Sequence, residues 1–266
     1  MMEILEEVEL CFPQLLNASC KKPMRTHFEV ILSYIILSSI TLLTTTLNLL
    51  VIISIAHFKQ LYTPSNILIL SLAVSDFFVG LLMFFQIILI DGCWFLGDLM
   101  CTLYYVLDYT ITSASIGTMV LISIDRYVAI CDPLHYSTKV TQKRVHVCVC
   151  LCWIYSVIFQ ILILKGNLKQ PGRYNSCSGE CVVVSDYITE LVDLVVSFIG
   201  PVTVIIVLYM KVFVVAVSQA RAMRSHIAAI TLQGSVKVTV KKSEMKAART
   251  LGVVILQPGS SETNVL

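Results

Sequence analysis

Residues 101–127 read CTLYYVLDYTITSASIGTMVLISIDRY, an apolar stretch that contains Asp108 and ends in the charged triplet Asp125-Arg126-Tyr127. As an α-helix rising about 1.5 Å per residue, the stretch places Asp108 roughly 10 Å from its first residue and the triplet roughly 26 Å farther along. A bilayer core is about 30 Å thick, so this pattern predicts a membrane-spanning helix with an acid near one face and the triplet near the other. Such an arrangement indicates a protein that transmits a signal across a membrane.

The composition indicates that lipid is the solvent of most of the chain. Hydrophobic residues make up 57% of the sequence and charged residues 14%, which is too little polar surface for a water-soluble protein of this size. A lone strand cannot satisfy its backbone in lipid, so each long apolar stretch is expected to be a helix. We therefore predict an all-α membrane protein with spans at Val30–Ala56, Ile67–Ile90, Leu103–Ile130, Val145–Leu164 and Ile188–Val217.

A sixth apolar stretch, residues 246–256, has about half the length of a span before the polar sequence of residues 257–266 begins. We therefore expect five full transmembrane helices, a partial sixth and no seventh. The expected organisation is an extracellular N-terminus at 1–27, five helices with their loops at 28–217, an intracellular loop at 218–245, the partial helix at 246–256 and an aberrant polar tail at 257–266.

The distribution of basic residues predicts the orientation. Thirteen of the 19 Lys and Arg residues fall on one side of this arrangement and six on the other, which places the N-terminus outside by the positive-inside rule. Asn17-Ala18-Ser19 is then a usable glycosylation site. On the same side lie Cys11, Cys20, Cys93, Cys101, Cys177 and Cys181, where disulfides persist.

Several functions lack any signal in the sequence. There is no catalytic triad, glycine-rich phosphate loop or metal-ligand spacing, so we expect neither an enzyme nor a resident metal or cofactor. The net charge of +2 offers no case for a nucleic-acid partner.

An ordered set of marks, spread over the five spans, resembles the rhodopsin-like (class A) G-protein-coupled receptors. The marks are Asn48 and Val51, residues 72–76 (LAVSD), Cys101 with the triplet, Trp153, and Pro201 with Tyr209. Within that family the chain resembles the trace amine-associated receptors, in Asp108, the Cys93-Trp94 pair, Cys177 with Cys181, and residues 246–252 (KAARTLG). The resemblance implies a rhodopsin-like helical bundle truncated in helix six.

Two acids form the expected ligand site. Asp108 is costly in a membrane interior, and a protonated amine would supply its counter-charge and charge-assisted hydrogen bonds. Asp193 lies at a similar depth and resembles the second amine site of diamine-sensing members; Glu190 lies one turn above it. Tyr109 and Thr112 are expected near the face of Asp108. The alternatives are a structural role for Asp108, and an Asp193 that is protonated or faces outer water.

The resemblance also assigns roles elsewhere. It implies that Arg126 engages a heterotrimeric G protein and is held at rest by Asp125, with Tyr127 and Tyr209 belonging to the same coupling region. Asp76 and Ser115 resemble the buried sodium site, whose other ligands belong to helices six and seven. The expected disulfides are Cys101–Cys181 and Cys20–Cys177, with Cys11 and Cys93 free or paired with each other.

These observations predict an amine receptor, sensing diamines, in the plasma membrane. A rival from another class is an amine transporter, although the broken helices or inverted repeats of transporters are not visible. A third interpretation is a non-signalling truncated receptor that is retained in the endoplasmic reticulum and can associate with full-length receptors.

Overall fold

The computed structural model describes residues 9–15, 17–23 and 25–232. Over these ranges the chain forms helices and two isolated β-bridges but no strand. The α-helices are α1 (His27–His57), α2 (Pro64–Ile90), α3 (Asp98–Cys131), α4 (Tyr136–Lys139), α5 (Gln142–Ile163), α6 (Lys165–Lys169), α7 (Tyr187–Asp193) and α8 (Gly200–Leu232). A 3-10 turn covers Lys59–Leu61, and a π-helical segment, Leu194–Ile199, joins α7 to α8.

Within the described residues, five helical stretches are long and apolar enough to cross a membrane, which confirms the predicted spans. They are α1, α2, α3, α5 and the continuous run Tyr187–Ser225. Each predicted range lies inside its helix to within one residue. The predicted partial helix at 246–256 and the polar tail at 257–266 lie outside the described residues.

Side-chain caps start four of the longer elements. The capping oxygen comes from Thr26, Thr63, Thr141 and Asp186, each accepting from the backbone N–H three residues later. Such caps satisfy an N–H group that has no partner within the helix. In α2 the cap is followed by Pro64, whose missing N–H costs nothing at the first helical position.

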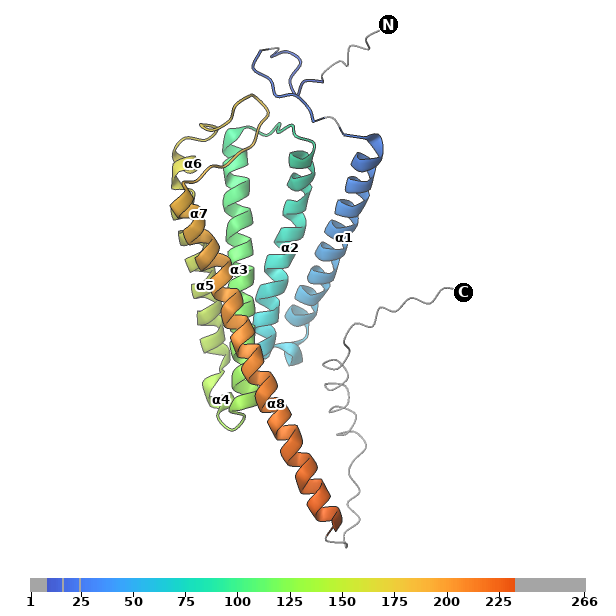
Figure 1. The fold of residues 1–266 in the computed structure, drawn as a ribbon, viewed down its shortest axis with the longest axis vertical. Coiled ribbons are helices and arrows are strands. Elements are labelled where there is room, and N and C mark those ends of the chain that lie inside the picture. Colours follow the sequence, from blue (N-terminus) through green and yellow to red (C-terminus); the bar gives the residue numbers. More distant parts are fainter. Residues whose placement is uncertain (1–8, 16, 24, 233–266) are drawn as a thin grey trace, which may run out of the picture. The chain divides into compact units, whose positions relative to one another are not determined.

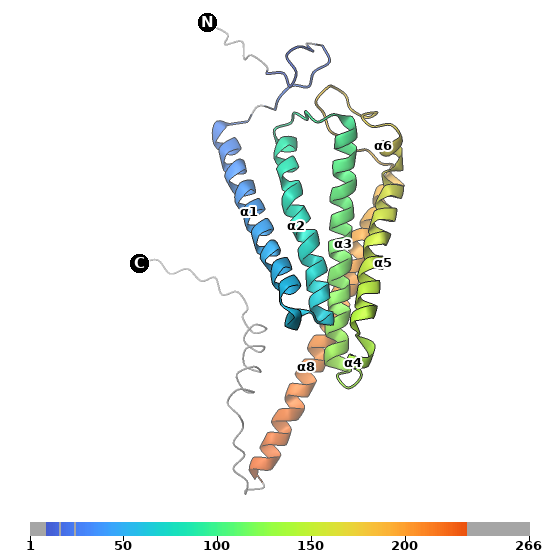
Figure 2. The ribbon, with the colours of Figure 1, turned by 180° about the vertical axis from the view of Figure 1, so that it is seen from behind.

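Helix α3 is the central element of the unit formed by residues 1–216. It packs against α2, α5, α6 and the π-helical segment, while α1 packs on the far side of α2. Figures 1 and 2 show α2 lying between α1 and α3, with α5 beside α3. A residue on α3 can therefore contact several other helices, which makes α3 the natural carrier of a site.

The interior of this unit contains many small and hydroxyl side chains beside its hydrophobic ones, and large apolar side chains are exposed on its surface. Ser75, Ala114 and Thr118 are fully buried, whereas Leu42 on α1 is 70% exposed. At the centre, Trp153 Nε1 donates to Ser71 Oγ over 3.1 Å, and Ser71 Oγ lies 3.2 Å from Thr118 Oγ1. Small and hydroxyl residues allow close helix packing in lipid, where apolar side chains gain nothing from facing inward.

In the fifth span the backbone hydrogen bonding changes from α-helical to π-helical just before Pro201. Pro201 has no N–H for the carbonyl of Ser197, and its ring crowds that carbonyl. The helix accommodates this by widening into the π-helical turn of Leu194–Ile199. Ser197 lies within that turn, so the proline shapes the backbone around the site described below.

The expected loop at 218–245 is wrong for residues 218–232, which continue α8 to Leu232. Residues 217–232 are also the described part of a second compact unit. The end of the apolar run marks where the chain leaves the membrane and does not mark the end of the helix. No Gly or Pro occurs between Pro201 and Gly234, and residues 219–224 are good helix formers.

Candidate functional site

A cavity of about 410 Å³ lies among α3, α5, α7 and the π-helical segment. It brings together four of the five residues expected to bind ligand: Tyr109, Thr112, Glu190 and Asp193. Seven of its 14 lining residues are polar or charged, namely Thr112, Ser113, Gln160, Ser185, Glu190, Asp193 and Ser197, and the others are apolar or aromatic. A cavity of this size and lining is typical of a small-molecule site.

Asp108, the fifth expected residue, lies next to this cavity but is not part of its lining. Its side chain is half-buried and forms no hydrogen bond or ion pair with any residue in the described ranges. Asp108 immediately precedes Tyr109 on α3, and Tyr109 lines the cavity together with Glu190 and Asp193. Among the described residues, Asp108 therefore has no structural hydrogen-bond or ion-pair partner.

Three tyrosines lie within one turn of Asp108 in the sequence of α3, and their rings are close to one another. The rings of Tyr104 and Tyr105 have centroids 5.3 Å apart, and those of Tyr105 and Tyr109 are 5.9 Å apart. Trp94 adds a further ring 6.0 Å from Tyr104. A carboxylate next to aromatic faces suits an organic cation, which gains both charge pairing and cation–π attraction.

Asp193 is held by two side chains that the sequence analysis did not identify. Gln160 Nε2 donates to Asp193 Oδ1 over 3.0 Å, and Ser197 Oγ donates to the same oxygen over 2.8 Å. Gln160 is 1% exposed although the residues next to it on α5, 157–159 and 161–163, are all apolar. A buried amide in a predicted span was the signal in the sequence, because such a group requires a polar partner.

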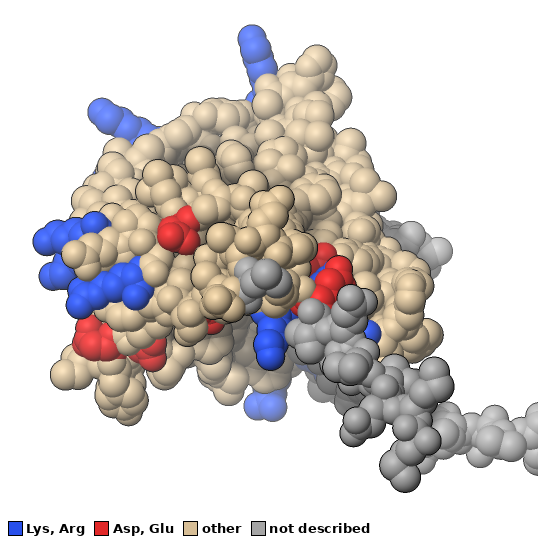
Figure 3. Space-filling view, turned by 90° about the horizontal axis from the view of Figure 1, so that it is seen from above, with Lys and Arg blue, Asp and Glu red and all other residues tan. Residues whose placement is uncertain are grey.

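Three disulfides close the end of the bundle that carries the N-terminal segment. Cys101–Cys181 and Cys20–Cys177 are present as expected, and of the alternatives left open for Cys11 and Cys93 the structure has them paired. Backbone bonds reinforce the closure, including Trp94 N–H to Gly179 O at 2.8 Å. Seen from above (Figure 3), uncharged residues cover most of this end, and Lys and Arg gather mainly at one edge.

We expect the paired substitutions Cys20→Ser and Cys177→Ser to lower the free energy of unfolding by about 2–4 kcal/mol, because they release a long closed loop. Thermal unfolding in detergent micelles measures the loss. Cys148→Ser is the matched control, because Cys148 is a free, exposed cysteine. An equal change in both proteins would contradict a stabilising role for the disulfide.

At the opposite end of α3, Asp125 is 4% exposed and has three partners. Arg126 Nη2 lies 2.9 Å from Asp125 Oδ2, which is the contact that the resemblance implied. Tyr136 Oη donates to Asp125 Oδ1 over 2.7 Å, and Ser65 Oγ donates to Oδ2 over 3.0 Å. The triplet is thereby tied to α4 and α2 as well, which sequence reasoning missed.

Tyr127 and Tyr209 occupy different surroundings at this end. Tyr127 lines an apolar cavity of about 410 Å³ with Cys131, Met210, Val214 and other residues of α8. Tyr209 is exposed and does not line that cavity. The structure therefore does not bring the two tyrosines to one site.

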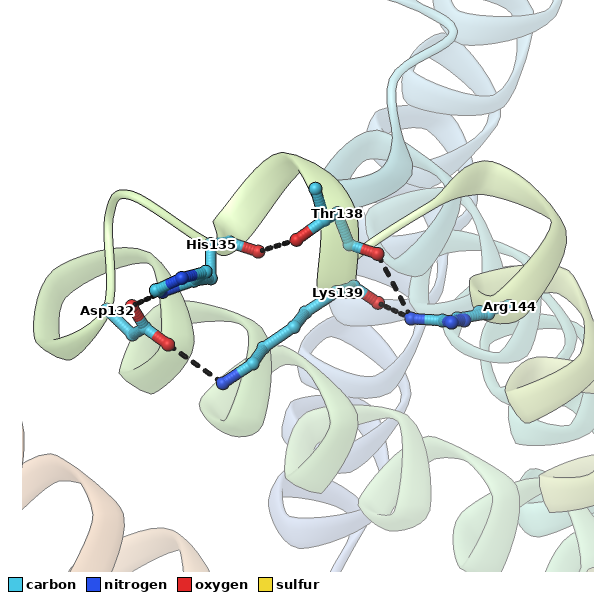
Figure 4. Close-up of polar contacts among 5 residues, drawn as sticks. All are labelled: Asp132, His135, Thr138, Lys139 and Arg144. Carbon is cyan, nitrogen blue, oxygen red and sulfur yellow. Dashed lines mark hydrogen bonds and ion pairs between the residues drawn. The ribbon is translucent and has the colours of Figure 1, made fainter.

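The loop after α3 carries an exposed ion-pair cluster (Figure 4). Asp132 Oδ2 accepts from Lys139 Nζ over 2.8 Å, and its Oδ1 lies 2.8 Å from His135 Nδ1. The hydrogen bond from Lys139, followed by that from His135, lowers the pKa of Asp132 to about 2. Arg144 Nη1 instead donates to the carbonyls of Thr138 and Lys139.

We expect Lys139→Met to raise the pKa of Asp132 toward the ordinary value of about 3.9. Because the folded-state pKa is depressed, the stability that this carboxylate contributes is present above that ordinary value and is lost as the pH falls through about 2. A carbon-13 NMR titration of Asp132 measures the shift. Arg144→Met should leave the titration unchanged, because Arg144 bonds only backbone carbonyls in this cluster; an equal change in both variants would refute the assignment.

Asp76 and Ser115, the expected sodium-site remnant, are in contact. Ser115 Oγ donates to Asp76 Oδ1 over 3.2 Å. Hard cations need about six oxygen ligands, and in the part of the chain that the structure describes no group of three or more His, Cys, Asp or Glu side chains is placed to hold a metal. The described residues therefore supply only part of such a site.

Comparison with known proteins agrees with this arrangement. Residues 47–257 match the family model of the 7 transmembrane receptor (rhodopsin family). The chain is 36% identical to trace amine-associated receptor 13c of Danio rerio over 93% of its own length and 74% of the relative's. It is 36% identical to trace amine-associated receptor 8a of Rattus norvegicus (94% and 75%) and 34% identical to trace amine-associated receptor 4 of Mus musculus (94% and 74%).

The family model covers most of the chain, and the relatives are matched over about three quarters of their length. The matched range contains most of the marks by which the sequence resembled this family, from Asn48 and residues 72–76 to Trp153, Pro201 and Tyr209. The chain belongs to the rhodopsin family of G-protein-coupled receptors and, within that family, is similar to the trace amine-associated receptors.

Proposed function

We propose that this chain is an amine receptor of the plasma membrane that signals through a heterotrimeric G protein, and that its ligands are diamines. The observation that carries the proposal is that Asp193 and Glu190 line one cavity with Tyr109, the residue that follows Asp108 on α3. Carboxylates at membrane depth require counter-charge. The names of the relatives, trace amine-associated receptors, support an amine as the source of that charge.

The two acids of the proposed site, Asp108 and Asp193, favour a ligand with two positive charges. Like charges close together in a low-dielectric site repel each other, so one acid must be neutralised or two cations must be bound. One ammonium would pair with Asp108 beside its aromatic neighbours. The second would enter the cavity and pair with Asp193, and Glu190 at the exposed rim would attract cations toward it.

The other end of α3 supplies the connection to a G protein. Asp125 holds Arg126 at rest, and Arg126 is half-exposed, so it is accessible once the pair opens. By the resemblance, the segment that moves to open it is the one expected at residues 246–256, which lie outside the described residues. The N-terminus is proposed to be outside, where Asn17 is exposed and open to glycosylation.

The test measures cytosolic cyclic nucleotide and uptake of labelled amine in the same cells over a panel of monoamines and diamines. Two forms are compared: the 266-residue chain, and residues 1–245 of that chain joined to helices six and seven of the Danio rerio relative. Surface labelling of an N-terminal tag, with and without Asn17→Gln, reports location and orientation. A dose-dependent rise or fall in the messenger without uptake supports the receptor.

Arg126→Ala is the matched control, because it should silence the messenger response and leave amine binding intact. Uptake of amine without a messenger response would instead establish the transporter. A response from the joined form alone, with the 266-residue chain held inside the cell, would support the non-signalling interpretation of this chain.

A further inference from the structure

Gln160 is the most enclosed polar side chain of the candidate ligand cavity. It lies on α5, is 1% exposed and contributes to the cavity lining beside Asp193 and Ser197. Its neighbours in sequence, residues 157–159 and 161–163, are all apolar. A glutamine at this depth therefore needs polar partners, and the structure shows where its two polar atoms lie.

The amide nitrogen of Gln160 completes a closed set of hydrogen bonds. Nε2 donates to Asp193 Oδ1 over 3.0 Å and approaches Ser197 Oγ at 3.4 Å, while Ser197 Oγ donates to the same Oδ1 over 2.8 Å. A carboxylate can only accept, so the amide must present its nitrogen to Asp193. The orientation of Gln160 is thus set by its partners.

This orientation leaves two acceptors without a donor. Gln160 Oε1 has almost no accessible surface and bonds to none of the described residues. Both donors to Asp193 meet at Oδ1, and Oδ2 bonds to none of the described residues. A buried acceptor without a donor is unfavourable, so a ligand that brings N–H groups to both atoms gains from satisfying them.

We infer that Gln160 sets the specificity of this site: it orients the Asp193 carboxylate and adds its own Oε1 as a second acceptor for a primary ammonium group. This inference rests on the proposed function, since it describes the second charge of a diamine. A primary ammonium has three N–H donors and can bond both acceptors. A dimethylated ammonium has one donor and must leave one acceptor unpaired.

The experiment measures displacement of a labelled linear diamine from the 266-residue chain in lipid nanodiscs. Competitors are the unlabelled diamine, its tetramethyl derivative and the monoamine of equal length. Gln160→Leu should weaken diamine binding roughly tenfold or more and leave monoamine binding nearly unchanged. It should also reduce the ratio of diamine affinity to tetramethyl-derivative affinity. The ammonium group that binds at Asp108 contributes equally to this ratio in the unchanged chain and in Gln160→Leu. Any difference in the ratio between the two proteins therefore reflects the end of the ligand that binds at Asp193.

Ser156→Ala is the matched control, since Ser156 is equally buried, lies one turn away on α5 and does not line the cavity. It should leave unchanged both the ratio of diamine to monoamine affinity and the ratio of diamine to tetramethyl-derivative affinity. In an Asp193→Ala background, Gln160→Leu should have no further effect on diamine binding, because its role acts through the same ammonium. Gln160→Met, of similar length and without hydrogen-bonding groups, serves as a second variant if Gln160→Leu does not fold.

Equal weakening of monoamine and diamine, or additive effects with Asp193→Ala, would show that Gln160 only packs the helices and would overturn the inference. Failure of the unchanged chain to bind any amine would count against the proposed function itself. The two failures are therefore distinguishable within one set of measurements.

Discussion

Replacing Asp108 with alanine is expected to abolish the response to every amine. The substitution leaves a bound ammonium in a desolvated site without its counter-charge, which costs about 2–5 kcal/mol, or roughly a 30- to 4,000-fold loss of potency. No other acidic side chain lies on α3 between Asp98 and Asp125, so no neighbour on that helix can take its place. The measurement is a cyclic-nucleotide dose–response curve with the receptor that carries helices six and seven.

Asp108→Asn separates charge from packing in this prediction. The amide has nearly the shape of the carboxyl group but cannot neutralise an ammonium, so the response should be lost as in Asp108→Ala. Surface labelling confirms that both variants reach the membrane. Full activity of Asp108→Asn would show that the group fills space and that amines bind elsewhere.

The second large effect is expected from Asp193→Ala, which should weaken diamines far more than monoamines. A diamine would lose a desolvated charge pair worth about 2–5 kcal/mol, whereas a monoamine bound at Asp108 does not reach this carboxyl group. The same dose–response assay, run with diamines and monoamines of matched length, measures both losses. Equal losses would eliminate the diamine class and leave the amine class intact.

Glu190→Gln is the informative companion to that variant. Glu190 lines the same cavity but is exposed at its rim. Solvent screens an exposed charge, so its loss should reduce affinity by much less than the loss of Asp193. If Glu190→Gln caused the larger diamine-selective loss, the second ammonium would lie at the rim.

Predicting the spans from sequence succeeded because lipid imposes a length on every crossing helix. An apolar run long enough to span must be helical to satisfy its backbone, so residue type and run length suffice. The same reasoning failed for residues 218–232, since a helix continues past the membrane surface wherever no residue stops it. The sites along α3 were also predictable, because one rigid helix sets the spacing of Asp108 and Asp125.

Partners across helices could not be predicted in the same way. Helices that are apolar on all sides carry no polar face to show how each is rotated about its axis, and one residue turns a helix by about 100°. The contact of Gln160 with Asp193, the ties of Tyr136 and Ser65 to Asp125, and the Cys11–Cys93 pair all depend on that rotation or on loop paths.

The sequence by itself determined that this protein is a multi-span helical receptor, with an acid near one end of its third span and a charged triplet at the other. Only the tertiary structure decided that Asp193 faces a cavity with one carboxylate oxygen occupied, and that Asp108 lies beside that cavity rather than in its lining. The physical reason is that membrane insertion depends on the chain's own apolar lengths, whereas a ligand site depends on the depth and rotation at which separate helices pack.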